Sequence, residues 1–234
     1  MENAMFPMEY LRVTQRAGVG SHLGSKALDF GGRDGSCDRV LAPFSGTVVR
    51  TRKNANGEMY LQSDQPVRWA DGTMDYLTVT FMHDSSFNVP EGAHVIQGQY
   101  IYDEGGMGGG NPCKFANHLH MEVSRGRVAA RQIRNGYGVY CTSNQVDIDS
   151  ALMLGDDVTI LAGGGYNWRR RSDATASLGT LSADNTYKAR SGDSWWRIAA
   201  QQLGSGLKCY ALAKANGKTI FSVIHPGDVL TLSI

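Results

Sequence analysis

Two histidines separated by a single residue, His118 and His120, lie in the segment NHLHMEV, residues 117–123. In an extended strand successive side chains point to opposite faces, so both imidazoles and Glu122 would share one face while the apolar residues between them face a core. Imidazole nitrogens on one face can bind a metal ion such as zinc. An isolated H-x-H is more often a buried histidine pair than a metal site, so the rest of the chain has to decide between these interpretations.

A hydrolytic zinc site takes three protein ligands from His and Asp or Glu and keeps a further position open, so H-x-H needs partners elsewhere. The upstream segment GSHLGSKALDFGGRDG contains His22 and Asp29, and zinc accepts a carboxylate together with imidazoles. His83 ends the apolar run YLTVTFMH. Asp34 is the alternative carboxylate, but Asp29 is favoured because the letters ALDF have the apolar flanks of a strand that enters a core.

The elements that must position these side chains are mainly β-strands. Between residues 40 and 123 short apolar runs alternate with turn residues, as in an antiparallel β domain. In YLTVTFMH the alternation places apolar residues on one face and Thr78 and Thr80 on the other, which predicts a half-buried strand. The glycine run at residues 105–110 is interpreted either as a hairpin loop or as a groove wall that a thin peptide can approach.

Composition restricts the class of protein. The chain has 234 residues, a formal net charge of +1 and a hydrophobic fraction of 41%, which fits a globular protein and gives no indication of nucleic-acid binding. No apolar stretch approaches the roughly 20 residues that span a bilayer, so membrane insertion is not expected. The first residues lack a signal-peptide pattern, which predicts synthesis in the cytoplasm of the producing cell.

The chain is expected to contain a mainly β domain at residues 1–155, with antiparallel sheets forming a groove, a linker at 156–185, and a small βααβ domain at 186–234. The linker contains AGGG and an RRR run that is expected to be solvated. In the tail, Asp193 is the expected N-cap of the helix SWWRIAAQQL, and Gly204 and Gly217 are expected to end the two helices.

The tail segments SGDSWWRIA, ALAKANGK and IHPGDVLTL together resemble a LysM domain. This resemblance implies binding to glycans that contain N-acetylglucosamine, chiefly peptidoglycan or chitin. The candidate glycan-binding residues lie in the loops GDSWW and TIFSVIHPG; they are Gly192, Asp193, Ser194, Trp195, Ile220 and His225. A structural role in the small core is an equal alternative for the tryptophans.

The order His, Asp, His, His-x-His, with APFSGTVV after the first pair and HLHMEV at the end, resembles the M23 (LytM/lysostaphin-like) zinc metallopeptidases of peptidoglycan. The resemblance covers residues 5–154 and implies that His22, Asp29 and His120 bind Zn²⁺. It also implies that His83 and His118 are unliganded catalytic histidines, without saying which is the base. The longer interval between His22 and Asp29 departs from the usual His-x-x-x-Asp pattern.

These resemblances together predict a zinc endopeptidase that cleaves an amide bond in the stem peptide or cross-bridge of peptidoglycan and is anchored to the wall by LysM. The absence of a signal-peptide pattern favours a phage endolysin that acts on the bacterial cell wall, and a virion-associated lysin would look similar. The alternatives are a non-catalytic cell-wall-binding or regulatory protein and an N-acetylmuramoyl-L-alanine amidase.

Overall fold

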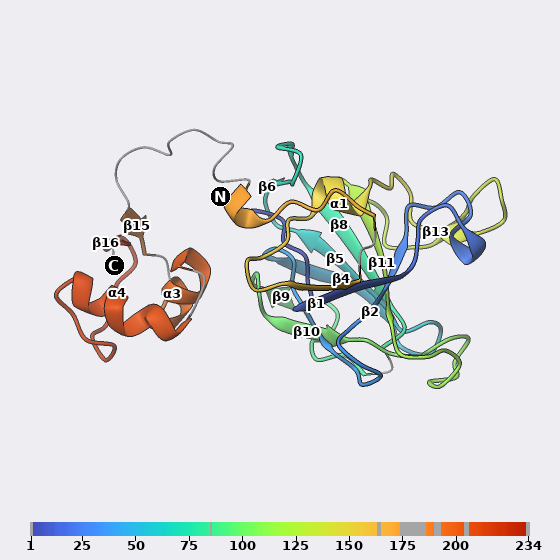
Figure 1. The fold of residues 1–234 in the computed structure, drawn as a ribbon. Helices are drawn as coiled ribbons and strands as arrows, with labels where there is room; N and C mark the ends of the chain where they lie inside the picture. The colour runs from blue at the N-terminus through green and yellow to red at the C-terminus, as the bar shows by residue number, and fades with distance from the viewer. Residues whose placement is uncertain are drawn as a thin grey trace. The chain divides into compact units, whose positions relative to one another are not determined.

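The computed structural model describes residues 2–84, 86–162, 165–173, 186–189, 193–203 and 206–232. The chain forms two compact units, residues 1–174 and residues 175–234 (Figure 1). None of the helices in the described ranges is long and apolar enough to cross a membrane.

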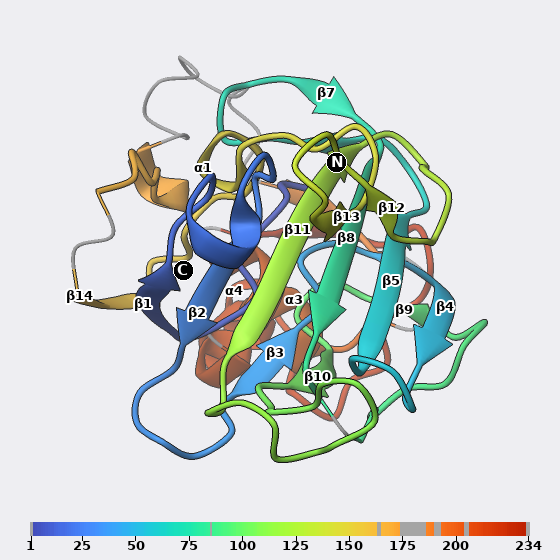
Figure 2. The same ribbon diagram turned by 90° about the vertical axis from the view of Figure 1, so that its right-hand side faces the viewer.

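The first unit is built on one eight-stranded sheet whose long central strands lie side by side in Figure 2. In spatial order the strands are β14 (Thr159–Ala162), β1 (Tyr10–Gln15), β2 (Leu28–Gly31), β11 (Leu119–Arg125), β8 (Leu77–Met82), β5 (Glu58–Ser63), β4 (Gly46–Arg52) and β9 (His94–Val95). Every neighbouring pair is antiparallel except β1 and β14, which are parallel. The sheet is therefore antiparallel, as predicted, except at this one edge, where the parallel pair makes it mixed.

Short elements flank this sheet. Three two-stranded sheets pair β3 (Arg39–Leu41) with β10 (Tyr100–Asp103), β6 (Val67–Arg68) with β7 (Met74–Asp75), and β12 (Ile133–Arg134) with β13 (Tyr140–Cys141). The helical pieces among the described residues of this unit are the 3₁₀ turn η1 (Gly20–His22), the one-turn helix α1 (Ile148–Ala151) and residues 171–173. The unit is thus mainly β, as predicted.

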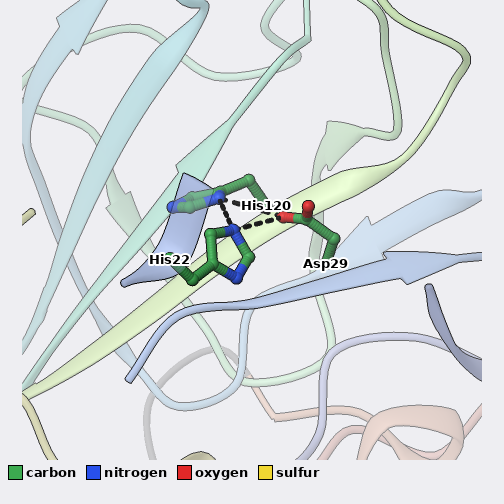
Figure 3. Close-up of side chains that lie close together, drawn as sticks. All are labelled: His22, Asp29 and His120. Atoms are coloured by element: carbon green, nitrogen blue, oxygen red, sulfur yellow. Dashed lines mark hydrogen bonds and ion pairs between the residues drawn. The ribbon is translucent and has the colours of Figure 1, made fainter. Parts of the chain in front are cut away.

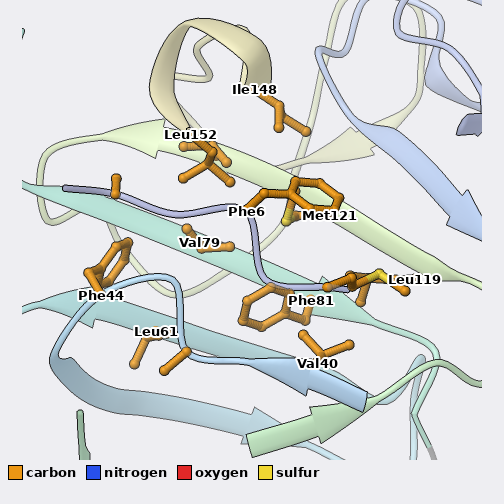
Figure 4. Close-up of a cluster of buried hydrophobic side chains, with 14 of the residues drawn as sticks. Phe6, Val40, Phe44, Leu61, Val79, Phe81, Leu119, Met121, Ile148 and Leu152 are labelled. Atoms are coloured by element: carbon orange, nitrogen blue, oxygen red, sulfur yellow. The ribbon is translucent and has the colours of Figure 1, made fainter. Parts of the chain in front are cut away.

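One face of the sheet carries the apolar core (Figure 4). In β11 the residues between the histidines and after them, Leu119, Met121 and Val123, are at most 1% exposed, as the alternation predicts. They pack with aromatic side chains from the loops and the N-terminal segment, including Phe6 and Phe44. Burial of this face orients the opposite side chains of β11 toward the candidate site.

The opposite face of the sheet is also covered, so the prediction of a half-buried strand for β8 is wrong. Thr78 and Thr80 are each only 1% exposed. The segment that follows β11 closes over them, because Thr78 Oγ1 donates to the carbonyl oxygen of Gly126 and accepts from the amide of Val128. Gln62 of β5 donates to the carbonyl of Val128 as well. Thr78 and Gln62 on the polar face are thereby hydrogen-bonded to a loop that periodicity does not reveal.

The first part of the expected linker is folded into the first unit. Residues 159–162 form β14, and the Trp168 ring packs edge-on against Phe6 with centroids 5.3 Å apart. The arginine run is not simply solvated, since Arg169 donates to the carbonyl of Ala70 and Arg170 to the carbonyls of Gly155 and Val158. Backbone pairing and these carbonyl contacts override the linker-like composition, and residues 174–185 lie outside the described residues.

The second unit has the predicted βααβ order. Strand β15 (Thr186–Lys188) pairs antiparallel with β16 (Val229–Thr231), and between them lie α3 (Trp195–Leu203), η2 (Gly206–Lys208) and α4 (Cys209–Ala215). The side chains shared by its small core include Trp195, Ile198, Ala199, Leu212 and Leu230. Both helices therefore present their apolar stripe to the same core.

The caps of these helices differ in part from the prediction. Ser194, not Asp193, caps α3, because its Oγ accepts the amide of Arg197 at 3.2 Å and the helix starts at Trp195. Asp193 instead accepts the hydroxyl of Tyr187 at 2.8 Å. At the end of α4, Gly217 adopts φ +66°, the left-handed conformation that terminates a helix. Gly204, the expected end of α3, lies outside the described residues.

Candidate metal centre

Three side chains from separate segments converge on one point (Figure 3). His22 comes from η1, Asp29 from β2 and His120 from β11. The Nε2 atom of His22 lies 3.1 Å from Nδ1 of His120 and 3.2 Å from Oδ1 of Asp29. Nδ1 of His120 lies 3.0 Å from the same carboxylate oxygen. The three residues predicted to bind zinc are thus brought together.

Strand register explains two of these positions and a turn explains the third. Asp29 and His120 are direct cross-strand partners in the antiparallel pair β2–β11, so their side chains share a face. The residues between η1 and β2 turn the chain back, with Gly24 at φ +72° and the amide of Ser25 bonded to the carbonyl of His22. The long interval between His22 and Asp29 is this turn.

The alternative carboxylate does not reach the cluster. Asp34 is exposed, and its Oδ1 accepts the backbone amide of Ser36 at 2.7 Å within its own loop. The structure therefore brings Asp29, and not Asp34, to the two histidines.

In each imidazole, the hydrogen bond made by the nitrogen that points away from the cluster determines whether the other nitrogen presents a lone pair to the cluster. Nδ1 of His22 lies 3.3 Å from the carbonyl oxygen of Arg16, which can only accept a hydrogen bond, so Nε2 carries the lone pair. Nε2 of His120 lies 3.2 Å from Oε1 of Glu122, which leaves the Nδ1 lone pair free. Two imidazole lone pairs and a carboxylate oxygen meeting at one point fit a zinc ion.

The surroundings of Asp29 favour the ionised form of its carboxyl group. Burial opposes its ionisation, yet hydrogen bonds with His120 and His22 hold the pKa of Asp29 well below its usual range. Burial would likewise lower the pKa of His120, but hydrogen bonds to Asp29 and Glu122 raise that pKa to about 9. In the absence of a cation, the buried carboxylates thus retain a proton on the imidazole between them, and a bound cation would replace that positive charge.

The other two histidines lie next to the cluster without belonging to it. The rings of His83 and His118 have centroids 4.4 Å apart. Their Nδ1 atoms face carbonyl oxygens, that of Met107 at 2.7 Å and that of Ala116 at 2.8 Å. The Nε2 atom of His118 lies 3.9 Å from Oδ2 of Asp29, so this nitrogen is directed toward the ligands.

Position and electrostatics distinguish His83. It stands just after β8 at φ +93°, a conformation that non-glycine residues rarely adopt and that functional sites often contain. Burial, together with the neighbouring His118 and His120, lowers the pKa of His83 to about 3. Its imidazole is therefore neutral near pH 7, with a lone pair on Nε2.

The glycine run packs against the backbone that carries these histidines. Gly105 exchanges both backbone hydrogen bonds with His118, and a side chain at Gly105 would overlap the carbonyl oxygen of His83. A side chain at Gly106 would overlap the carbonyl of Phe115 in the same way. The run thus forms a closely packed hairpin loop, in which the lack of side chains allows the loop backbone to contact the backbone of neighbouring segments of the same chain.

The predicted glycan residues of the tail fall into different environments. Gly192 lies outside the described residues, Asp193 and Ser194 stand at the start of α3, and His225 is exposed. Trp195 is 3% exposed and its Nε1 donates to the carbonyl of Ser222 at 2.8 Å, so it belongs to the core. Ile220 is partly buried against the same core.

The candidate glycan-binding residues left out two exposed aromatic side chains of the same tail segments, and the support of the metal cluster was not predicted. Trp196 is 55% exposed and Phe221 is 89% exposed. The helical period was the available signal, since it aligns Trp195 with Ile198 and therefore turns Trp196 outward. Beside the metal cluster, the backbone amide of Thr142 donates a hydrogen bond to Glu122. Thr142 lies in the loop after β13, and no local sequence pattern connects that loop with β11.

Comparison with known proteins gives a domain assignment for the tail. Residues 187–233 match the LysM domain family, which confirms the resemblance seen in the sequence. The two helices between paired strands described above are the structural counterpart of that match.

For the larger unit the comparisons give similarities. The chain is 28% identical over 167 residues to Morphogenesis protein 1 of Bacillus phage B103, which covers 71% of this chain and 44% of that protein. The chain thus spans less than half the length of this curated relative.

Solved structures similar to this chain include peptidases. The catalytic domain of lysostaphin from Staphylococcus simulans is 22% identical with a TM-score of 0.35, over 56% of this chain and 85% of that one. A putative peptidase M23 from Pseudomonas aeruginosa is 22% identical with a TM-score of 0.37, over 53% and 46%. A zinc containing peptidase from Vibrio cholerae is 16% identical with a TM-score of 0.35, over 62% and 41%. At TM-scores below 0.5 the function has to be argued from the site itself.

Proposed function

We propose that this protein is a zinc-dependent peptidoglycan hydrolase that cleaves an amide bond in the stem peptide or cross-bridge. The observation that carries the proposal is the convergence of His22 Nε2, Asp29 Oδ1 and His120 Nδ1 within 3.2 Å of one another, beside two histidines outside the cluster. When bound there, Zn²⁺ supplies Lewis-acid polarisation of a carbonyl group and acidification of water.

The chain's own residues have distinct roles in this proposal. His22, Asp29 and His120 would hold the ion. Neutral His83, with its Nδ1–H donated to Met107, can accept a proton through Nε2. When protonated, His118, whose Nε2 faces Asp29, can donate a hydrogen bond to charge that develops on the amide oxygen, or a proton to the leaving amine.

The LysM domain at residues 187–233 supports a cell-wall substrate. A domain that holds the glycan converts a weak encounter between the hydrolase unit and a peptide into an intramolecular event at a high effective concentration. We propose that exposed side chains of this unit, including Trp196 and Phe221, contribute to glycan contact.

The similarity to a morphogenesis protein of a Bacillus phage supports a phage origin. We propose that the protein acts on the bacterial cell wall during the phage life cycle, either as an endolysin or as part of a virion. Incubation of purified cell walls with intact phage particles distinguishes these two settings. A virion component would release wall fragments in this assay, whereas an endolysin, which is not part of the particle, would not.

Two other functions use the same observations. A non-catalytic wall-binding or regulatory protein would need the LysM domain but no complete ligand set, and the complete set at His22, Asp29 and His120 favours an enzyme. An N-acetylmuramoyl-L-alanine amidase would share zinc chemistry but would cut the bond between glycan and peptide.

Mass spectrometry of purified cell walls after digestion with the zinc-loaded protein tests the proposal. New amino termini inside the stem peptide or cross-bridge are expected. Glycan strands freed of whole stem peptides would instead show an amidase, and walls that remain intact would show a binding protein. A His118→Ala variant serves as the control for contaminating hydrolases, since it retains the ligand set.

A further inference from the structure

Glu122 stands beside the metal cluster without facing it. Its Oε1 lies 3.2 Å from Nε2 of His120, on the side of the ring away from the cluster. A neutral imidazole has one N–H and one lone pair, so a carboxylate at Nε2 selects the tautomer that leaves the lone pair on Nδ1. Nδ1 is the atom that converges with His22 and Asp29.

The carboxylate of Glu122 is itself held in place by Thr142, which lies in the loop that follows β13 and covers this face of the sheet. Glu122 is 0% exposed, and its Oε2 accepts the Thr142 amide at 2.7 Å and the Thr142 hydroxyl at 2.5 Å. Gln132 approaches the same oxygen at 3.4 Å. With Oε2 occupied in this way, Oε1 is the oxygen available to His120.

The two histidine ligands are therefore supported differently. His22 donates to a neutral backbone carbonyl, that of Arg16, at 3.3 Å. His120 is held by an anion that makes hydrogen bonds with Thr142. A buried anion behind an imidazole increases the basicity of the ligand and restricts ring rotation, so it affects metal affinity as well as geometry.

We propose that Glu122 is a positioning residue that orients His120 with Nδ1 toward the metal, and that Thr142 in turn positions Glu122. This inference rests on the proposed zinc site. Glu122, which is neither one of the proposed zinc ligands nor one of the two proposed catalytic histidines, thereby acquires a function.

The competing explanation is that Glu122 only anchors the covering loop to the sheet. Glu58 provides the matched control, because it is another buried carboxylate on the sheet, is 1% exposed, and accepts the Tyr60 hydroxyl at 2.9 Å. Among the described residues none of the hydrogen bonds of Glu58 involves a zinc ligand. A general effect of removing a buried charge would appear equally in both variants.

The experiment measures the zinc dissociation constant of the full chain by competition with a chromogenic chelator. We expect Glu122→Gln to weaken zinc binding about 10- to 100-fold, the usual effect of losing such a carboxylate, while Glu58→Gln changes it by less than about 2-fold.

A second pair of variants tests the same chain of contacts without altering a charge. Thr142→Val removes the hydroxyl donor and should weaken zinc binding several-fold, and Thr142→Ser restores the donor and should restore the affinity. This pair also serves if Glu122→Gln fails to fold. Wild-type zinc affinity in both Glu122→Gln and Thr142→Val, or equal losses in Glu122→Gln and Glu58→Gln, would overturn the inference. A wild-type chain that binds no zinc would instead overturn the proposed function, and with it this inference.

Discussion

Nδ1 of His83 lies 2.7 Å from the carbonyl oxygen of Met107, and the amide of Met107 returns a hydrogen bond of 2.8 Å to the carbonyl of His83. This double contact joins the end of β8 to the glycine loop before β11. It holds His83 in its left-handed conformation and leaves Nε2 as the only ring atom that can exchange a proton. The side chain is thus restrained both at its backbone and at its ring.

Removal of any one of the three proposed zinc ligands should remove the metal. We expect His22→Ala, Asp29→Ala and His120→Ala to contain much less than one zinc per chain, because each deletes one of the three converging atoms. Elemental analysis of the purified variants measures this. Asp34→Ala is the control and should keep its zinc, since Asp34 is exposed and bound to Ser36; depletion in this variant would mean that the wrong carboxylate has been assigned.

Removal of either proposed catalytic histidine should separate chemistry from metal binding. We expect His83→Ala and His118→Ala to retain zinc but to lose about 10²-fold or more in turnover, the usual effect of a positioned acid, base or oxyanion donor. The rate of peptide cleavage and the zinc content are measured on the same samples. Wild-type turnover in either variant would eliminate that histidine from the mechanism.

Gly105 should be as necessary for turnover as the histidines it touches. A methyl group at Gly105 would overlap the carbonyl oxygen of His83, so Gly105→Ala must displace either His83 or the strand segment that carries His118. We expect kcat to fall at least about 10-fold while zinc content is unchanged, because small displacements of catalytic groups are costly. Gly136→Ala is the matched control, since its added carbon meets nothing within 4 Å. Equal kcat values for the two variants would contradict the prediction.

Buried Glu104 should make stability depend on pH. Burial raises its pKa to about 7, from 4.5 for an ordinary glutamate, although amides of Asp38 and Gly32 donate to it. Between these pH values the folded state holds a proton that the unfolded state releases, so this group destabilises the fold as pH rises from about 4.5 to 7.

Glu104→Gln removes that titration, so its stability relative to wild type should improve by about 3 kcal/mol between pH 4.5 and pH 8, whatever the fixed cost of the substitution. Urea denaturation of both proteins at the two pH values gives the difference. A difference that stays constant with pH would show that Glu104 ionises normally in the folded chain.

The two tryptophans of the tail should behave oppositely. Trp195→Ala should destabilise the LysM domain by about 3–5 kcal/mol, since the side chain is 3% exposed. Trp196→Ala should leave the fold intact and weaken pull-down on insoluble peptidoglycan, because this ring is 55% exposed. Thermal denaturation and the pull-down are measured together, and full wall binding by Trp196→Ala would exclude this ring from glycan contact.

Separate units should divide the two activities. Residues 1–174, which include the packed Trp168, should cleave soluble peptide, whereas residues 175–234 should bind walls without cutting them. If residues 1–174 account for all wall binding, the LysM domain does not tether the hydrolase.

Local patterns in the sequence determined the type of most elements and one face of each. Alternation in NHLHMEV predicted the buried side of β11 and placed His120 and Glu122 on the other side, and the helical stripe beginning at Trp195 predicted the interior of the tail. These predictions succeeded because burial of a periodic apolar face depends only on neighbours along the chain. The location of the N-cap at Ser194 differed by one residue, since adjacent Asp and Ser are both suitable caps.

Contacts between distant segments were decided only by tertiary structure. The register of β2 against β11 places Asp29 opposite His120, the turn after η1 returns His22 to them, and the covering loop supplies Thr142 to Glu122. The sequence could propose the ligands by type and by resemblance, but it could not determine which ring nitrogen faces the metal. That choice depends on which acceptor lies behind each ring, and such acceptors are brought there by strand pairing and loop closure over long separations in the chain.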